Sequence, residues 1–386
     1  MGIQNSLTTS ALSSKLLNII FTSLSRFPNL SKLHLRRILT TTSILRSISI
    51  CTITSLVLDG CPANITSSEI QKDSDPLEFK LTHLKFIHLD VDVVNRYADP
   101  WWMILINPST IQFLAIDGFH MPYTFITQLA SPIMPPLKHL HTLELIANTL
   151  PPVELGIALK KMPGLTELTV NDPSQPFVED DPSNSLDSQS HNFAQLFPEE
   201  VVPELKKVSV YYQIALPLCR GRQLQSVTTS GAMKEEEAVC LYKRLRDGSS
   251  NSLSSLSMAM ETVTMEYLTN VLTTFSTLRL LAIVMKKRAR FTAAEARRML
   301  LDVALPVTLY TFEVRKNTDS DGMVLYISRL GMSTRKTNKK LIMVYSYITA
   351  NKESFGRIAD IRQFSKAGMM IVCTDHPGLL TLSGFS

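Results

Sequence analysis

The sequence predicts an α/β solenoid, with a parallel sheet on its concave face and helices on its convex face. Three observations lead to this prediction. A short apolar pattern recurs along most of the chain, segments with helical periodicity separate its copies, and the motifs GxGxxG, GxxxxGK[ST], HExxH and GxSxG are all missing. The sequence therefore indicates a repeat protein that binds a partner and performs no chemistry itself.

Composition sets the outer limits of this interpretation. The chain has 386 residues, of which 45% are apolar, so it can bury a large core. No apolar run approaches the roughly 18–20 residues that a transmembrane helix needs. Five cysteines form no CxxC pair, which fits a reducing compartment and predicts a cytoplasmic or nuclear protein. We expect no cofactor and no metal site, because no cysteine or carboxylate completes the pair His139 and His141.

The recurring pattern is apolar-x-x-apolar-x-apolar, which predicts one short strand in each copy. We recognise eleven copies, whose ten intervals average about 28 residues, the spacing of a solenoid with one strand and one helix per repeat. The third copy continues through Ile87 and Leu89, and the last through Tyr310 and Phe312. The copies begin at Leu30, Ile53, Leu84, Ile111, Leu140, Leu165, Leu205, Leu224, Leu253, Leu278 and Val307.

The segments between the copies predict helices, because their apolar residues recur at helical spacing. Start signals agree with this: Pro122 precedes one helix, Pro151 and Pro152 another, and Thr292 with Glu295 could form a capping box. One repeat cannot bury its own apolar face, so the units are expected to stack. The predicted helices are Tyr123–Ala130, Val153–Lys161, Lys234–Arg246, Met265–Thr274 and Thr292–Leu301.

The repeats predict three parts. Residues 1–29 precede the first copy, and Ser10–Leu24 is expected to be a capping helix. A transit peptide, from the acid-free Ser/Thr-rich start, and N-myristoylation, from Met1–Ser6, are the alternatives. Residues 30–314 hold the repeats. Residues 315–386 are interpreted as degenerate repeats and a C-terminal cap, with strands expected at Met323–Ser328, Leu341–Ile348 and Met369–Cys373.

Two segments interrupt or flank the regular repeats. Residues 171–200 are rich in acidic residues, Ser, Asn and Pro, and predict a surface loop that is either a partner-binding insert or a tolerated insertion. A basic cluster spans Lys286–Arg298. It could meet phosphates or an acidic protein, but no nucleic-acid motif surrounds it, so we favour a solvated convex face and expect no nucleic-acid partner. Trp101 and Trp102 are expected to pack at the edge of a repeat.

Alternation along each strand predicts which side chains face a protein partner on the concave side. Asp59, Asp90 and Asp117 would stack on neighbouring strands as an acidic ladder, which could bind a basic, partly apolar peptide. The alternative is that each Asp only begins the turn that leaves its strand, as in Asp59-Gly60. The predicted partner-binding residues are Asp59, Phe86, His88, Asp90, Phe113, Asp117, Glu144 and Tyr211.

Two copies carry a family likeness: Ile53–Cys61 and Leu140–Asn148 each end on a Cys or Asn three residues after the last apolar position. The sequence resembles leucine-rich-repeat proteins over residues 30–314, and in particular the repeat region of fungal F-box proteins. This resemblance implies a horseshoe whose repeats select substrates for a cullin–RING ubiquitin ligase, with the ligase adaptor as a second partner. Cys61 is then expected to satisfy backbone groups of its turn. The Leu-Pro-x-Glu opening of an F-box is not found, and a stand-alone scaffold or inhibitor is the alternative.

Overall fold

The structure is a computed structural model of the whole chain, and it describes a defined subset of its residues. These residues form two compact units. The first comprises Met1–Ser174 with Gln189–Leu205, and the second Gln175–Ser188 with Lys206–Ser386. Each unit is treated by itself below. The residues described are 17, 19–62, 65, 77–87, 101–118, 121–146, 150, 152–170, 196–285, 308–309, 311–316, 323–330, 341–348 and 369–371.

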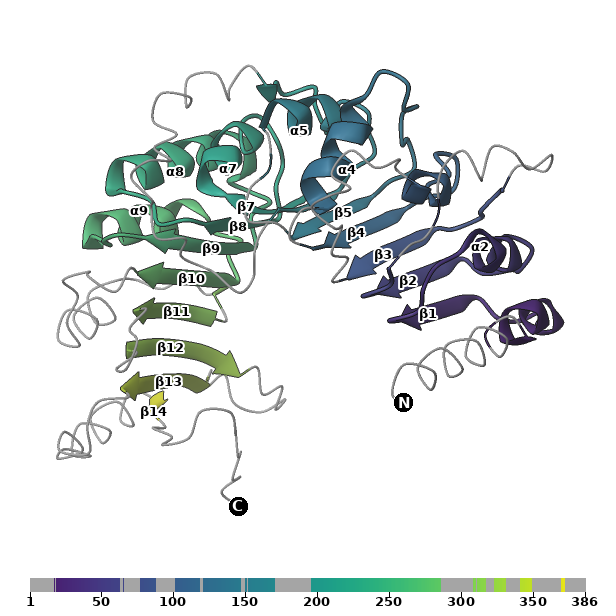
Figure 1. Ribbon diagram of the computed structural model, residues 1–386. Helices are drawn as coiled ribbons and strands as arrows, with labels where there is room; N and C mark the ends of the chain where they lie inside the picture. Colours follow the sequence, from purple (N-terminus) through teal and green to yellow (C-terminus); the bar gives the residue numbers. More distant parts are fainter. Residues whose placement is uncertain are drawn as a thin grey trace, which may run out of the picture. The chain divides into compact units, whose positions relative to one another are not determined.

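The first unit is built on six short strands that pair in chain order (Figure 1). All five pairings between them are parallel. Successive parallel strands need a crossover between them, so each return segment passes over one face of the sheet. The strands are β1 (Lys32–Arg36), β2 (Ser55–Asp59), β3 (His83–Ile87), β4 (Phe113–Asp117), β5 (Thr142–Ile146) and β6 (Glu167–Val170).

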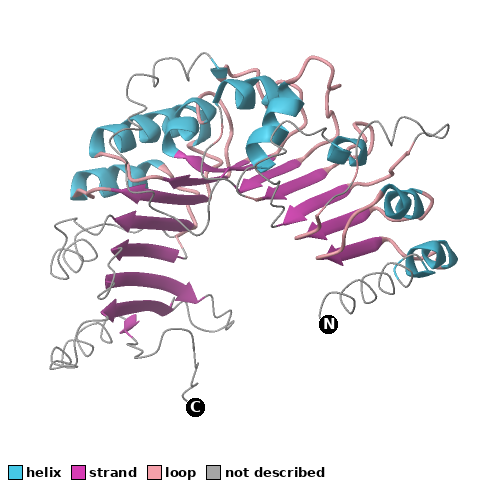
Figure 2. Cartoon of the chain, in the orientation of Figure 1, coloured by secondary structure: helices cyan, strands magenta, loops and turns pink. Residues whose placement is uncertain are grey.

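Helices of the first unit lie on one face of this sheet (Figure 2). The Thr41 hydroxyl accepts a hydrogen bond from the Ile44 amide at 3.4 Å and so caps one of them. Trp102 stacks on Phe125 with ring centroids 4.8 Å apart, which fits the expected packing role of the tryptophan pair. The helices are α2 (Thr42–Ser49), α4 (Met121–Ala130) and α5 (Pro152–Leu159), with 3-10 turns η1 (Leu24–Arg26) and η3 (Trp101–Leu105).

The second unit continues the same construction and then changes direction. Its first five strands pair in parallel. The next two are each antiparallel to the strand before them, and the last pairs in parallel with the strand before it. The strands are β7 (Lys207–Tyr211), β8 (Ser226–Ser230), β9 (Ser255–Met260), β10 (Leu280–Met285), β11 (Thr311–Lys316), β12 (Met323–Leu330), β13 (Leu341–Ile348) and β14 (Met369–Ile371).

Three helices cover one face of β7–β10: α7 (Tyr212–Leu218), α8 (Glu235–Ser249) and α9 (Met265–Thr274). The predicted helix Met265–Thr274 matches α9, whose first turn is capped by the Thr264 hydroxyl at 3.2 Å from the Tyr267 amide. The predicted helix Thr292–Leu301 lies outside the described residues. Among the described residues, β1–β6 form a run of consecutive parallel strands in one unit, and β7–β11 form such a run in the other. This α/β arrangement is compatible with a repeat solenoid.

The apolar pattern supplies the core, as predicted. In β2, β4 and β5 the second and fourth strand residues are fully buried, for example Leu56 and Leu58. The first apolar residue of a copy is buried as well, just before the strand begins, as at Ile111 and Leu140. A copy of this kind therefore contributes three side chains to the space between sheet and helices. Removing this surface from water is the main stabilising contribution.

Two copies begin at other residues than predicted. Strand pairing aligns Leu84 with Leu56 and Phe86 with Leu58, so the third copy begins at Leu81 and not at Leu84. The intervals around it become 28 and 30 residues, in place of 31 and 27. The last copy begins at Leu309, because Phe312 aligns with Leu281. Both regions contain extra apolar residues that satisfy the spacing in two frames, and only backbone pairing separates the frames.

A backbone ladder connects consecutive repeats just before their strands. The carbonyl of Thr54 accepts hydrogen bonds from two amides of the next repeat, those of Thr82 at 2.8 Å and His83 at 3.0 Å. The carbonyls of Ser31, Thr82, Gln112, His141, Lys206, Gln225 and Ser254 do the same for the repeats that follow them. The same backbone position is therefore fixed to its neighbour in repeat after repeat.

Side-chain hydroxyls add a second ladder, which the sequence interpretation missed. Where Thr or Ser precedes the first apolar residue of a copy, its hydroxyl donates to a carbonyl of the previous repeat. Thr110 donates to Leu81 at 2.9 Å, and Thr277 donates to Leu253 at 2.8 Å. The sequence signal is a Thr or Ser beside the first apolar residue of a copy, as in Thr52-Ile53-Thr54.

Candidate protein-binding face

In each unit, one face of the sheet packs against helices and the other faces away from them. We call the latter the helix-distal face, and its side chains are those that alternate with the buried ones along each strand. In the first unit, register sets the central residues of the six strands in one row: His34, Val57, Lys85, Ala115, Glu144 and Thr169.

The predicted residue Phe86 does not belong to this face. It is fully buried and aligns with the core residues Leu58 and Ile116. The prediction was wrong because the third copy was placed three residues too late, and three residues along a strand bring a side chain to the opposite face. His83 and Lys85 occupy the positions that were assigned to Phe86 and His88. His88 and Asp90 lie outside the described residues.

The acidic ladder is also corrected. The residue beside Asp59 on β3 is Ile87 and not Asp90. Asp117 lies on β4, so two strand spacings, about 9.6 Å, separate the backbone positions of the two residues. The repulsion that a stack of three adjacent carboxylates would create is therefore not present at these positions.

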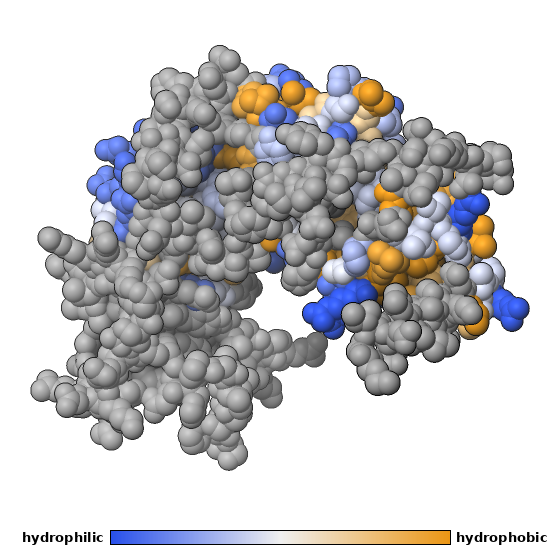
Figure 3. All heavy atoms as spheres, viewed as in Figure 1, coloured by the Kyte–Doolittle hydropathy of each residue, from blue (hydrophilic) through white to orange (hydrophobic). Residues whose placement is uncertain are grey.

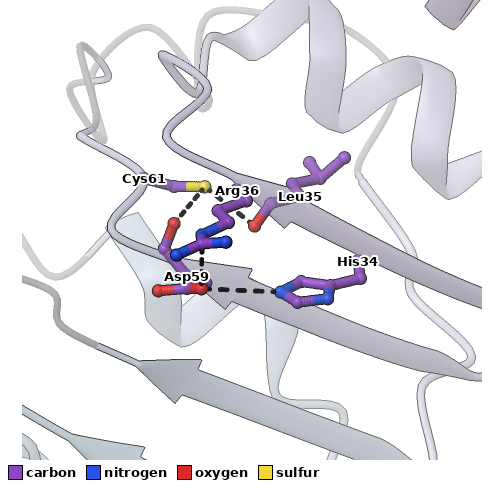
Figure 4. A network of polar contacts seen from close by, with 5 residues as sticks. All are labelled: His34, Leu35, Arg36, Asp59 and Cys61. Carbon is purple, nitrogen blue, oxygen red and sulfur yellow. Dashed lines mark hydrogen bonds and ion pairs between the residues drawn. The ribbon is translucent and has the colours of Figure 1, made fainter.

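Asp59 instead contacts basic side chains of β1 (Figure 4). Its Oδ2 lies 3.3 Å from Arg36 Nε and 3.8 Å from His34 Nε2. The Asp59 side chain is 17% exposed, whereas those of Arg36 and His34 are 70% and 56% exposed. These contacts join the first two strands on the helix-distal face and reduce the local negative charge.

Cys61 lies on the other side of the same turn. Its Sγ is 3.3 Å from the carbonyl oxygen of Leu35 and 3.5 Å from that of Asp59, so the thiol can donate to either (Figure 4). The residue is fully buried. This geometry agrees with the expected role of Cys61, which was to satisfy backbone groups of its turn.

The remaining predicted residues that the structure describes do lie on helix-distal positions. Phe113 begins β4 and stacks on His83 with ring centroids 5.7 Å apart and an interplanar angle of 22°. Glu144 is half-buried at the centre of β5, and Asp117 ends β4. Tyr211 ends β7 in the second unit, where it aligns with Ser230. Their role in partner binding stays a prediction.

The helix-distal face of the second unit is different in chemistry. At the facing positions of β8 and β9 it carries the small residues Ser226, Thr228, Ser255 and Ser257. Strand β10 contributes Leu280, Ala282 and Val284 in the same rows. These three strands carry no charged residue at those positions. A surface of this kind provides contact area but few strong anchoring groups.

The space-filling view separates polar and apolar regions of the first unit (Figure 3). Hydrophilic residues gather at the carboxyl end of β1, and apolar residues lie over α4 and α5. Exposed apolar side chains on those two helices are Tyr123, Val153 and Ile157. The helix side therefore also carries apolar surface, together with charged residues such as Arg46 of α2 and Glu154 of α5.

Among the described residues, the most deeply buried charged side chain is that of Arg222, which the sequence interpretation missed. It is 2% exposed, and its Nη1 donates to the carbonyls of Pro217 at 3.2 Å and Leu218 at 2.9 Å. Arg244 Nη1 donates to the neighbouring Leu216 carbonyl at 2.6 Å. Two arginines thus bind the carboxyl end of α7, where carbonyl groups lack helical partners and the helix dipole favours positive charge. Their role is structural.

The described part of the chain contains no cluster of three or more His, Cys, Asp or Glu side chains that could hold a metal ion. None of its helices is both long and apolar enough to cross a bilayer. In comparisons with known proteins, no family model matches the chain, and no curated protein sequence is significantly similar to it.

Proposed function

We propose that the chain is a leucine-rich-repeat protein of horseshoe form, and that it binds another protein on the concave, helix-distal face of its sheet. The observation that carries this proposal is the repeating arrangement of the strands. Parallel strands align the same helix-distal positions in rows, so side chains from many repeats present one continuous surface. The role is binding, with no catalytic step.

Three structural features support the leucine-rich-repeat assignment. Of the two intervals around the third copy, that of 28 residues falls within the roughly 20–29 residues of leucine-rich repeats, and that of 30 exceeds this range by one residue. The ladders of backbone and hydroxyl hydrogen bonds repeat at the same position of each copy. Cys61, at the Cys/Asn position of its repeat, lies within donor distance of two backbone carbonyls.

We further propose that the bound protein is a substrate of a cullin-type ubiquitin ligase, with this chain as its recognition component in the cytoplasm or nucleus. The support is the likeness of Ile53–Cys61 and Leu140–Asn148 to repeats of fungal F-box proteins. The second candidate is a stand-alone scaffold or inhibitor, which would bind a partner on the same face without any ligase component.

Affinity purification followed by mass spectrometry tests both the proposed binding face and the proposed link to a ubiquitin ligase. The wild type is compared with Val57→Arg/Glu144→Arg, which places two large cations on half-buried helix-distal positions. Ile133→Arg/Glu200→Arg, which makes the same change of net charge at exposed positions outside the strands, is the matched control. We expect one protein to be lost only from the first variant, while cullin and adaptor remain with all three. Absence of cullin and adaptor supports the scaffold, and a partner that all three forms retain contradicts the proposed face.

A further inference from the structure

Charges on the helix-distal face of the first unit are separated by sign. Strands β1–β3 carry Lys32, Arg36 and Lys85 there, and Asp59 is the one carboxylate among their facing positions. Asp59 contacts Arg36 at 3.3 Å, so the cations remain in excess. Strands β4 and β5 carry Asp117 and Glu144, and their facing positions hold no Lys or Arg.

The strand register holds the two groups of charges apart. Lys85 and Glu144 occupy the same row, but Ala115 lies between them on β4. Two strand spacings place their backbones about 9.6 Å apart, and the ion pairs found among the described residues do not include one between these two side chains. The small, buried Ala115 leaves this gap unfilled by any charged side chain. The face therefore has a basic end and an acidic end.

Apolar side chains occupy the middle of the same face. Val57, Ile87 and Phe113 are half-buried at facing positions of β2, β3 and β4. Phe113 is held by its stacking on the His83 ring. Partly exposed apolar groups between two charged ends are the composition of a protein-binding surface, with a central contact region and charges that orient the partner.

We propose that this face binds a polypeptide segment whose charges are divided in the opposite sense. Acidic residues of the segment lie over Lys32, Arg36 and Lys85, and basic residues lie over Asp117 and Glu144. Apolar residues of the segment contact Ile87 and Phe113, where the two groups of charges meet. This inference rests on the proposed function, which places the partner on the helix-distal face. A segment in the reverse orientation would set like charges against each other at both ends, so the face selects one direction.

The geometry also sets the length of the segment. Four strand spacings from β1 to β5 amount to about 19 Å. An extended chain covers that distance in about six residues, and a helix covers it in about thirteen. The acidic and basic groups of the partner are therefore expected within one short segment.

Selection from a displayed library of random 16-residue peptides tests the proposal on the full-length protein. We expect enriched peptides to carry an acidic block and a basic block on either side of apolar residues. An enriched peptide is then labelled, and its affinity is measured by fluorescence anisotropy. Lys32→Glu/Arg36→Glu should weaken binding by at least about tenfold, and Glu144→Lys should do the same.

Charge reversal in the peptide separates electrostatic recognition from damage to the fold. Replacing the acidic block by lysines should restore affinity for Lys32→Glu/Arg36→Glu, whereas a misfolded variant would recover nothing. Lys138→Glu/Lys160→Glu changes the same net charge outside the strands and should bind as the wild type does.

The outcomes also distinguish this inference from the proposed function. If an enriched peptide binds Phe113→Arg as it binds the wild type, the face does not bind polypeptide and both are overturned. If Phe113→Arg abolishes binding but enriched peptides lack opposite blocks, or the charge variants bind normally, only the inference is overturned. If no peptide is enriched, the inference is overturned as well, and the purification experiment decides the proposed function.

Discussion

The Ser249 hydroxyl donates a hydrogen bond to the carbonyl of Arg222 at 2.7 Å, joining the last residue of α8 to the segment before β8. The same oxygen accepts the Leu224 amide at 2.9 Å, and Ser249 is only 1% exposed. One buried hydroxyl thus satisfies two backbone groups. We expect Ser249→Ala to lower the free energy of unfolding by about 1–3 kcal/mol, because both groups lose a partner away from water.

Urea denaturation followed by circular dichroism measures this loss. Ser254→Ala is the control, since the Ser254 hydroxyl donates to Gln225 at 2.9 Å on an exposed site where water can replace it. Equal losses for the two variants would contradict the assigned importance of burial.

Gly248, the residue before Ser249, packs closely against the backbone of Arg222. A Cβ at this position would lie 2.8 Å from the carbonyl oxygen of Arg222 and 3.1 Å from its amide nitrogen. Alanine favours a helix over glycine by about 1 kcal/mol, but the backbone it would meet cannot turn aside as a flexible side chain can. We therefore expect Gly248→Ala to lower the thermal midpoint, with Lys243→Ala on the exposed side of α8 as a near-neutral control. A higher midpoint for Gly248→Ala would refute the close approach.

The hydroxyl ladder predicts a graded response at Thr110. Thr110→Val keeps the shape of the side chain but removes the hydrogen bond to Leu81. We expect a loss of about 0.5–1.5 kcal/mol in the free energy of unfolding, and Thr110→Ser should recover most of the contribution of the hydrogen bond. Chemical denaturation measures both variants. If Val and Ser behave alike, the hydroxyl contributes nothing to joining the repeats.

Burial raises the pKa of the Cys219 thiol to about 12 from its ordinary 9.0, although Arg222 and Arg244 act in the opposite direction. The unfolded state therefore releases this proton first as the pH rises. The contribution of Cys219 to stability is constant below about pH 9 and declines between pH 9 and 12. Comparing wild type with Cys219→Ala at pH 8 and 10.5 should show the advantage of the wild type shrinking by on the order of 2 kcal/mol.

Thiol labelling provides an independent check on the same residue. Iodoacetamide at pH 8 should modify the exposed Cys240 in the native protein and leave Cys219 unmodified, because Cys219 is buried and protonated. Peptide mass spectrometry identifies the labelled sites. Rapid native labelling of Cys219 would contradict its placement in the core.

The ion pair of Arg36 and Asp59 should contribute little to stability. Because the Arg36 side chain is 70% exposed, solvent screens the interaction. A double-mutant cycle with Arg36→Ala and Asp59→Ala is expected to give a coupling energy below about 1 kcal/mol, decreasing further in high salt. A coupling of several kcal/mol would show that the pair is structural, and its charge variants would then be unsuitable for binding tests.

Sequence periodicity predicted that each copy forms a strand, but the first residue of each copy was chosen from the spacing of apolar residues alone. It succeeded at Leu140, where only one frame fits. It failed around Leu84, because Leu81, Leu84, Phe86, Ile87 and Leu89 satisfy the spacing in two ways. The error transferred directly to the candidate site, since it placed the core residue Phe86 on the binding face and Asp90 beside Asp59.

Other features carry weak local signals. Helix α7 contains Pro217 and only 7 residues, so helical periodicity does not reveal it, and it depends on Arg222 and Arg244 for its last turn. The contact of Ser249 with Arg222 joins residues 27 apart in sequence. Such contacts arise from stacking, and no pattern within one repeat encodes them.

The paired amides that converge on carbonyls such as that of Thr54 have a consequence for how this chain can vary. Each repeat is fixed to its neighbour at that point, whereas the segment that returns over the helix side connects two fixed points. Residues gained or lost there can be absorbed locally, so the facing rows keep their alignment. Interval lengths of 28, 30, 29 and 25 between consecutive copies from Ile53 to Leu165 show this tolerance within a single molecule. A lineage could thus remodel its outer loops freely while the rows of the helix-distal face retained their order.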